Sequence, residues 1–93
     1  MTQYIGTAQW GTVTNQAYTG TASAVIAVSA GIFKVRLLST TDCYVRTDGV
    51  TATSSNGVYL PALQAEYATV RGGQGITAVQ VSAGGTLQVT ECM

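Results

Sequence analysis

Charged side chains are scarce in this sequence, with eight among 93 residues and a formal net charge of zero. Globular domains average roughly 25% charged residues, whereas the share here is 9%. The four cations are scattered and form no basic patch, which argues against a nucleic-acid partner. Histidine is absent, which removes the commonest general base near neutral pH and the commonest metal ligand.

The carboxylates offer little catalytic chemistry. Asp42 and Glu66 are the only plausible pair of the kind that glycosidases use, and nothing in the sequence places them together. Nucleophile triads that depend on histidine are excluded. We therefore expect no enzyme activity, no cofactor and no metal.

Cysteine and long apolar runs are also sparse. Cys43 and Cys92 cannot build a disulfide framework and lack the CxxC spacing of a metal site, so we expect two free thiols in a reducing compartment. The N-terminus has no basic segment ahead of an apolar stretch. The apolar run 24–28 is far shorter than the ~20 residues that cross a bilayer. These features predict a protein made in a cytoplasm, with no membrane partner.

Threonine, alanine, glycine and valine make up more than half of the chain. Threonine and valine favour pleated strands, glycine supplies turns, and strong helix formers are few. From Ser23 onward, strand-like runs recur roughly every 8–12 residues, the spacing of sandwiches and barrels. The sequence predicts an all-β domain, an antiparallel β-sandwich or jelly-roll-like fold with about seven or eight short strands.

The predicted strands cover 24–29, 32–39, 42–47, 50–53, 57–60, 67–71, 76–82 and 86–91, with a weaker candidate over 9–13. In 32–39, alternation places Phe33, Val35 and Leu37 in the core and Lys34 and Arg36 on the opposite face.

Two more strands show the same alternation. In 42–47, Cys43 and Val45 share one face, and Tyr44 and Arg46 share the other. In 86–91, Leu87 and Val89 are predicted to face inward, and Gln88 and Thr90 outward.

Turn residues separate these strands. Asp48-Gly49 predicts a two-residue hairpin, and Ser54-Ser-Asn-Gly57 predicts another turn, in which Asn56-Gly57 is able to take positive φ. Pro61 is expected to end a strand or lie at a sheet edge. The segment 62–66 fits either a single helical turn or a loop, and the glycine-rich segment 72–75 predicts a hairpin loop.

Residues 1–22 differ from the rest because they carry no charged side chain and include Tyr4, Trp10 and Tyr18. Two interpretations stay open: an irregular first strand, or an arm that reaches a neighbouring molecule and anchors through its aromatic rings. The predicted organisation is thus an arm or first strand over 1–22 and a β-sandwich domain over 23–93.

Eight residues are candidates for interfaces because they are aromatic or lie on outward strand faces. They are Tyr4, Trp10, Tyr18, Lys34, Arg36, Tyr44, Arg46 and Tyr59. The strand tyrosines fit a sugar-stacking surface, a protein interface or the edge of the core. The cations fit a cluster that meets an acidic partner, if Arg46 lies beside Lys34 and Arg36, or an ordinary solvated face.

The low charge itself favours assembly. Soluble monomers usually carry net charge, and edge strands are usually guarded by lysine or proline. This chain has one lysine and one proline. We therefore expect much of its surface to be covered by other chains.

Three segments also resemble small accessory virion proteins of tailed bacteriophages. They are Asp42-Cys-Tyr-Val-Arg46, Gly57-Val-Tyr-Leu-Pro-Ala62 and Val81-Ser-Ala-Gly-Gly-Thr-Leu-Gln-Val-Thr-Glu91, and the resemblance covers residues 23–91. It implies a capsid cement or decoration protein at the virion surface, whose partners are the major capsid protein and itself. The resemblance does not fix the oligomer number, and we expect a dimer or trimer. The alternatives are a tail, adaptor or fibre component, or a carbohydrate-binding β-sandwich module.

Overall fold

The computed structural model describes residues 10–71 and 74–92, and strands are the regular structure of this part of the chain. They are β1 (Trp10–Tyr18), β2 (Ile26–Ala27), β3 (Lys34–Ser39), β4 (Cys43–Arg46), β5 (Val58–Leu60), β6 (Glu66–Thr69), β7 (Gly75–Gln80) and β8 (Gly85–Cys92). No helix occurs among the described residues. The all-β prediction is confirmed.

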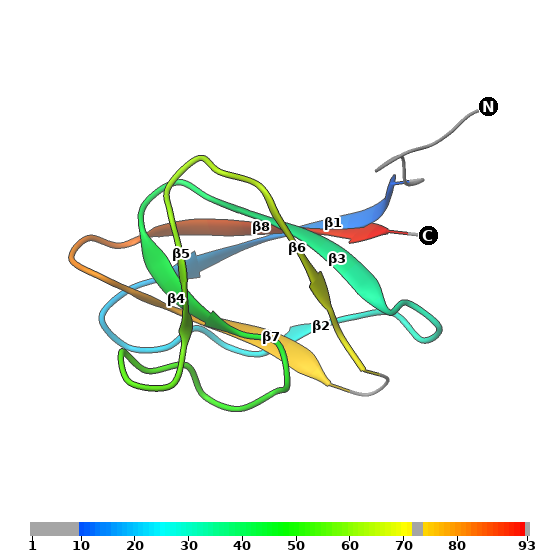
Figure 1. Cartoon of the computed structure of the whole chain (residues 1–93), viewed down its shortest axis with the longest axis horizontal. Coiled ribbons are helices and arrows are strands. Elements are labelled where there is room, and N and C mark those ends of the chain that lie inside the picture. Colours follow the sequence, from blue (N-terminus) through cyan, green and yellow to red (C-terminus); the bar gives the residue numbers. More distant parts are fainter. Residues whose placement is uncertain (1–9, 72–73, 93) are drawn as a thin grey trace.

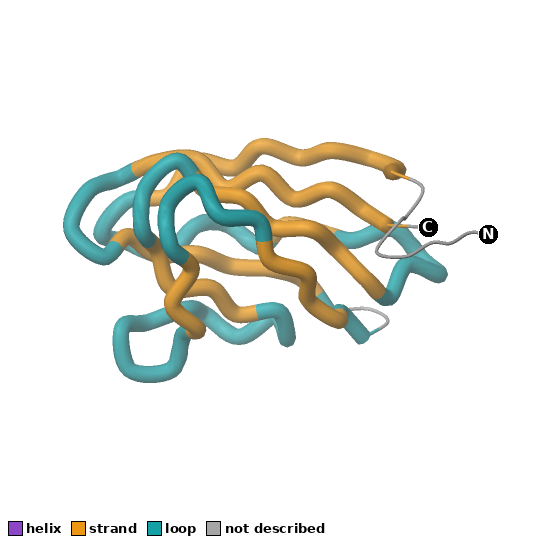
Figure 2. The backbone as a smooth tube through the Cα atoms, turned by 45° about the horizontal axis from the view of Figure 1, so that its top comes forward, coloured by secondary structure: helices purple, strands orange, loops and turns teal. Residues whose placement is uncertain are grey.

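The strands form two antiparallel sheets (Figure 1). The first sheet has the order β1-β8-β3-β6, and the second has the order β2-β7-β4-β5. The strands pair as they would in one long hairpin that is rolled into two layers. The first strand pairs with the last and so on inward, as β1–β8, β2–β7, β3–β6 and β4–β5. This is the jelly-roll arrangement of a β-sandwich, and Figure 2 shows the two layers with the loops at their ends.

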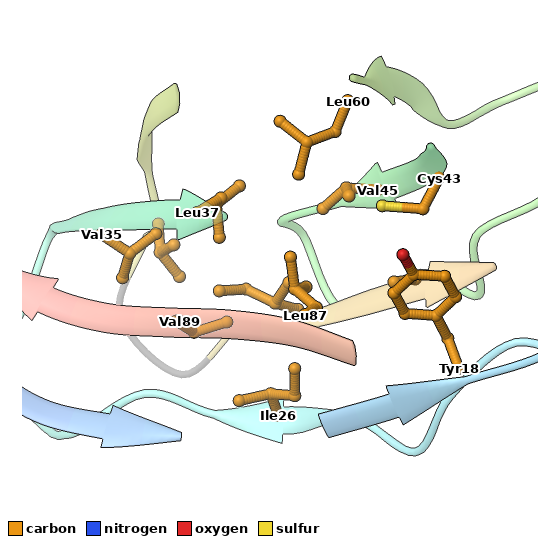
Figure 3. Close-up of a cluster of buried hydrophobic side chains, with 12 residues drawn as sticks. Tyr18, Ile26, Val35, Leu37, Cys43, Val45, Leu60, Leu87 and Val89 are labelled. Carbon is orange, nitrogen blue, oxygen red and sulfur yellow. The ribbon is translucent and has the colours of Figure 1, made fainter. Parts of the chain in front are cut away.

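The core lies between the inward faces of the two sheets (Figure 3). The first sheet contributes Val35, Leu37, Leu87 and Val89, each at most 4% exposed. The second contributes a matching set, which is Ile26, Cys43, Val45, Leu60, Ile76 and Ala78. Each fully buried aliphatic side chain contributes about 1.5–3 kcal/mol. The predicted inward positions of β3, β4 and β8 are therefore confirmed, except for Phe33.

Phe33 is 61% exposed rather than buried, so its predicted place in the core is wrong. The reason is that β3 begins at Lys34. Phe33 therefore precedes the sheet, and its carbonyl accepts a hydrogen bond from the Val70 N–H at 2.8 Å. Thr90 faces outward as predicted but is only 1% exposed, because β8 is central and Thr90 lies between Val13 and Arg36.

The predicted strand 50–53 does not form, and residues 47–57 instead make one long connection between β4 and β5. This connection folds over the outer face of the second sheet. Thr77 Oγ1 accepts from the Ala52 N–H at 3.0 Å and donates to the Val50 carbonyl at 2.7 Å. Thr77 is therefore buried although it lies on the outward face of its sheet.

Glycine has two different roles in this connection. Gly49 has a φ of +80°, which glycine adopts without strain. The predicted two-residue hairpin at Asp48-Gly49 is wrong, because no strand follows it over 50–53. The predicted turn at 54–57 forms, but neither Asn56 nor Gly57 has positive φ in it. Gly57 is needed for close approach instead, because a Cβ there would lie 2.5 Å from Tyr44 Cβ.

The turn between β5 and β6 contains a strained residue. Pro61 follows the end of β5, as predicted. The following residues form a turn rather than a helix. Leu63 has a φ of 60° and is 73% exposed, and its N–H donates to the Ser39 carbonyl at 2.8 Å. A branched side chain in the left-handed region is costly.

The N-terminal region contributes a strand to the first sheet. β1 pairs with β8 from Trp10↔Cys92 to Tyr18↔Gly85, with a register shift between Trp10 and Val13. Tyr18 is 2% exposed and belongs to the core. Tyr4 lies outside the described residues, as do residues 72–73 of the predicted glycine-rich hairpin loop.

Candidate interaction surfaces

The outward face of the first sheet carries three of the predicted interface residues, which are Trp10, Lys34 and Arg36. Strand alternation and register place Trp10 and Val13 of β1, Lys34 and Arg36 of β3, and Tyr67 of β6 on this one face. We call these five residues the aromatic–cationic face. Trp10, Val13 and Tyr67 are each about half exposed, at 55%, 49% and 49%.

Two cation–π contacts order this face. The Arg36 guanidinium lies 4.9 Å from the centre of the Trp10 ring, and the Lys34 ammonium lies 5.9 Å from the centre of the Tyr67 ring. Such contacts contribute about 0.5–1 kcal/mol at exposed sites. The rings thereby hold both cations close to the sheet and leave their own outer surfaces accessible.

The aromatic–cationic face contains no acidic side chain. Glu91 shares the inward face of β8 with Val89, and its Oε2 accepts from the Ser29 N–H at 2.7 Å. Glu66 lies opposite Leu37, which also faces inward. Among the described residues, the only ion pair joins Arg46 to Asp48 on the second sheet. The face therefore presents positive charge beside apolar rings.

Arg46 does not lie beside Lys34 and Arg36, so of the two interpretations left open for these cations the three-residue cluster is excluded. It lies on β4 of the other sheet, where its guanidinium pairs with the Asp48 carboxylate. Its Nη1 also donates to the Asn56 carbonyl at 2.8 Å. The hydrogen bond with Asp48 raises the pKa of Arg46 and holds the pKa of Asp48 below its ordinary 3.8. Arg46 thus fastens the 47–57 connection.

Tyr18 was predicted as an interface residue, and its burial corrects that prediction. Its hydroxyl donates to the Thr41 carbonyl at 2.8 Å or shares a hydrogen bond with Thr41 Oγ1 at 2.7 Å. A side chain enclosed within its own domain cannot contact another molecule. Tyr18 instead joins the end of β1 to Thr41 within the same domain.

Tyr44 and Tyr59 form a pair on the outer face of the second sheet. Their rings are 6.0 Å apart at 67°, an edge-to-face arrangement. The Tyr59 hydroxyl donates to Asp42 Oδ2 at 2.7 Å, and the Ala62 N–H donates to Oδ1 at 2.8 Å. These bonds lower the pKa of Asp42, and the carboxylate raises the pKa of Tyr59. Tyr59 is still 49% exposed.

A groove of about 350 Å³ opens between β5 and β6. Its apolar lining consists of Leu37, Val45, Val58, Leu60 and Ala68, and its polar lining includes Arg46, Asp48, Tyr59, Glu66 and Tyr67. The sequence alone did not reveal this groove, because β5 and β6 are consecutive strands that lie at the edges of different sheets. Glu66 and Asp48 line it, and Asp42 does not.

The described residues contain no group of three or more Cys, Asp or Glu side chains that could hold a metal ion. Cys43 and Cys92 are free and buried, and burial raises the pKa of the Cys43 thiol. In the same part of the chain, no helix has the length and apolar character needed to cross a membrane.

Comparison of the chain with protein-family models, with curated proteins and with solved structures gives no match.

Proposed function

We propose that this chain is a non-enzymatic structural protein of a tailed-phage virion, a cement or decoration protein that oligomerises and clamps neighbouring capsomers. The resemblance of residues 23–91 to small accessory virion proteins suggests the setting. The aromatic–cationic face is the single observation that carries the proposal. It supplies a surface on which a shell protein can dock.

The chemistry of this face suits a protein partner. Tryptophan, tyrosine and arginine are the residue types that most often dominate binding energy at interfaces. Trp10 and Tyr67 expose about half of their surface, and Arg36 lies against Trp10. Lys34 and Arg36 have no acidic neighbour on the face, so they complement a surface that carries carboxylates. The major capsid protein is the partner we assign to it.

The rest of the surface supports an assembled state. Among residues 10–71 and 74–92, ten large hydrophobic side chains are exposed, and they include Val25, Phe33, Val58, Leu63 and Val81. Exposed apolar groups of this number on a chain with eight charges favour association in water. The fold is also compatible, since jelly rolls build many viral capsid domains, although the same fold serves unrelated functions.

The test is binding to phage capsids that lack the chain. We expect the purified protein to bind such capsids at a fixed stoichiometry and to raise the temperature at which they release DNA. Arg36→Gln removes one cation of the face, and Arg71→Gln removes an exposed cation outside it. We expect the first variant to weaken capsid binding at least tenfold, and the second to bind as the original does.

Two results would contradict the proposal. One is a protein that is absent from purified virions by mass spectrometry and does not bind capsids. The other is equal binding by the Arg36→Gln and Arg71→Gln variants, which would remove the aromatic–cationic face from the interaction while leaving a role in the virion open to another surface.

The groove between β5 and β6 favours a second candidate, a carbohydrate-binding module. The lining of the groove includes Tyr59 and Tyr67 and combines apolar side chains with polar ones such as Arg46, a mixture of residue types that can hold a sugar. A glycan array distinguishes the two candidates. Saturable binding of a glycan that Tyr59→Ala abolishes, with no binding to capsids, would favour the module.

A further inference from the structure

The free edge of β1 is the least protected edge of the fold. In the order β1-β8-β3-β6, β8 is the one described strand that pairs with β1, so the other side of β1 has no strand among the described residues. β1 has nine residues and is the longest strand of the described part. Such an edge presents a row of backbone groups to any second strand.

The other edges are short or guarded. β2 has two residues, and β5 has three and is followed by Pro61. β6 has four residues and begins with the charged Glu66. β1 contains neither a charged residue nor a proline, and its register shift is confined to the stretch between Trp10 and Val13. The regular part from Val13 to Tyr18 is therefore open to pairing.

The side chains of β1 suit a second copy of itself. Val13, Asn15 and Ala17 share the outward face, and all three are exposed. In an antiparallel pair of identical strands with Asn15 opposite Asn15, Val13 of each copy lies beside Ala17 of the other. This register covers the exposed Val13 and brings no two charges together. It also leaves the irregular stretch between Trp10 and Val13 at the ends of the paired segment.

We propose that two copies of this chain pair antiparallel through β1, about a two-fold axis at Asn15, so that their first sheets join into one continuous sheet. The absence of charge along the strand fits a self-complementary edge better than it fits a partner of opposite charge. Homodimers are most often two-fold symmetric. The inference deepens the proposed function, on which its role in assembly rests.

The dimer has a consequence for capsid binding. Because the axis is perpendicular to the joined sheet, both aromatic–cationic faces lie on the same side of it. Two copies of Trp10, Lys34, Arg36 and Tyr67 then face one surface, which permits two contacts at once. Linked contacts bind more tightly than either contact alone.

The first test is the molecular mass of the full chain in solution by sedimentation equilibrium. We expect a concentration-dependent species at twice 9.6 kDa. Asn15→Asp keeps the side-chain shape and places two carboxylates across the axis, so we expect the dimer to dissociate at least about tenfold more readily. Thr69→Asp adds the same charge to β6, the opposite edge of the same sheet, and is expected to leave the dimer unchanged.

The second test gives a positive signal. In a variant with Asn15→Cys, mild oxidation is expected to produce a disulfide-linked dimer, since paired strands bring Cα atoms within disulfide reach. Thr69→Cys serves as the matched control and is expected to remain monomeric on denaturing gels. The natural cysteines do not interfere, because Cys43 and Cys92 are 0% and 6% exposed.

Three outcomes would overturn the inference: a monomer at all accessible concentrations, dissociation caused by Thr69→Asp but not by Asn15→Asp, or cross-linking through position 69 in place of 15. These outcomes are separate from the fate of the proposed function. A monomer that still binds capsids would refute the β1 dimer alone, whereas a β1 dimer without capsid affinity would refute the capsid role alone.

Discussion

Replacement of Tyr18 measures how firmly β1 belongs to the folded domain. In Tyr18→Phe the ring stays in the core, where Tyr18 is 2% exposed, and only the hydroxyl is lost. That hydroxyl contacts the Thr41 carbonyl at 2.8 Å and Oγ1 at 2.7 Å, and accepts from the Thr41 N–H at 3.3 Å. Loss of one buried hydrogen bond with its partners left unsatisfied costs about 1–3 kcal/mol.

Tyr18→Ala removes the ring as well and leaves a cavity between the sheets. Truncation of a buried aromatic side chain costs about 3–5 kcal/mol, which is a large share of the 5–15 kcal/mol that stabilises a typical domain. Urea denaturation followed by far-UV circular dichroism measures both variants. With a slope of about 1–2 kcal/mol/M, Tyr18→Phe is expected to lower the midpoint by about 1 M, and Tyr18→Ala by more than twice as much.

Tyr67→Ala is the control, because Tyr67 lies on the same sheet but is 49% exposed. We expect it to cost less than about 1 kcal/mol. If Tyr18→Ala unfolds at the same urea concentration as the original protein, β1 contributes nothing to the core, and the interpretation of this region as a detachable arm is restored.

Three further predictions concern stability. Gly57→Ala is expected to cost about 1–3 kcal/mol in urea denaturation, because its Cβ would lie 2.5 Å from Tyr44 Cβ; an unchanged midpoint would contradict the close approach. Leu63→Gly is expected to raise the free energy of unfolding by about 0.5–1 kcal/mol, since glycine relieves a φ of 60° and an exposed side chain loses little contact. Leu63→Ala is expected to gain nothing. Because the Arg46 ion pair lowers the pKa of Asp48 below 3.8, this pair stabilises the fold above that pH and is lost as the pH falls through the lowered value. In acid titrations, Asp48→Asn is expected to lose less stability than the original protein over that range, and parallel curves would refute this.

Period-two alternation determined which residues enter the core. Val35 and Leu37 face inward because the pleat sends every second side chain to one side, and the branched residues that occupy those places are apolar. The same rule cannot tell where a strand starts. Phe33 has the right parity but lies one residue before β3, so it is exposed.

Sheet neighbours were harder to predict than strands. Arg46 and Arg36 have equivalent positions in the alternation, but β4 and β3 lie in different sheets. The groove between β5 and β6 was equally hard to predict, because these two strands also lie in different sheets. Residues 50–53 have strand composition, but side chains take several of their backbone hydrogen bonds. The buried hydroxyl of Thr77 accepts from the Ala52 N–H and donates to the Val50 carbonyl, and this segment stays a connection.

The position of β8 has a consequence for the synthesis of this protein. β8 lies between β1 and β3 in the first sheet, yet it is the last of the eight described strands to be made. Trp10 finds its register partner only at Cys92. A ribosome must therefore release nearly all of these residues before the first sheet can close. We expect the nascent chain to fold late, with its uncharged β1 segment open to other chains until that moment.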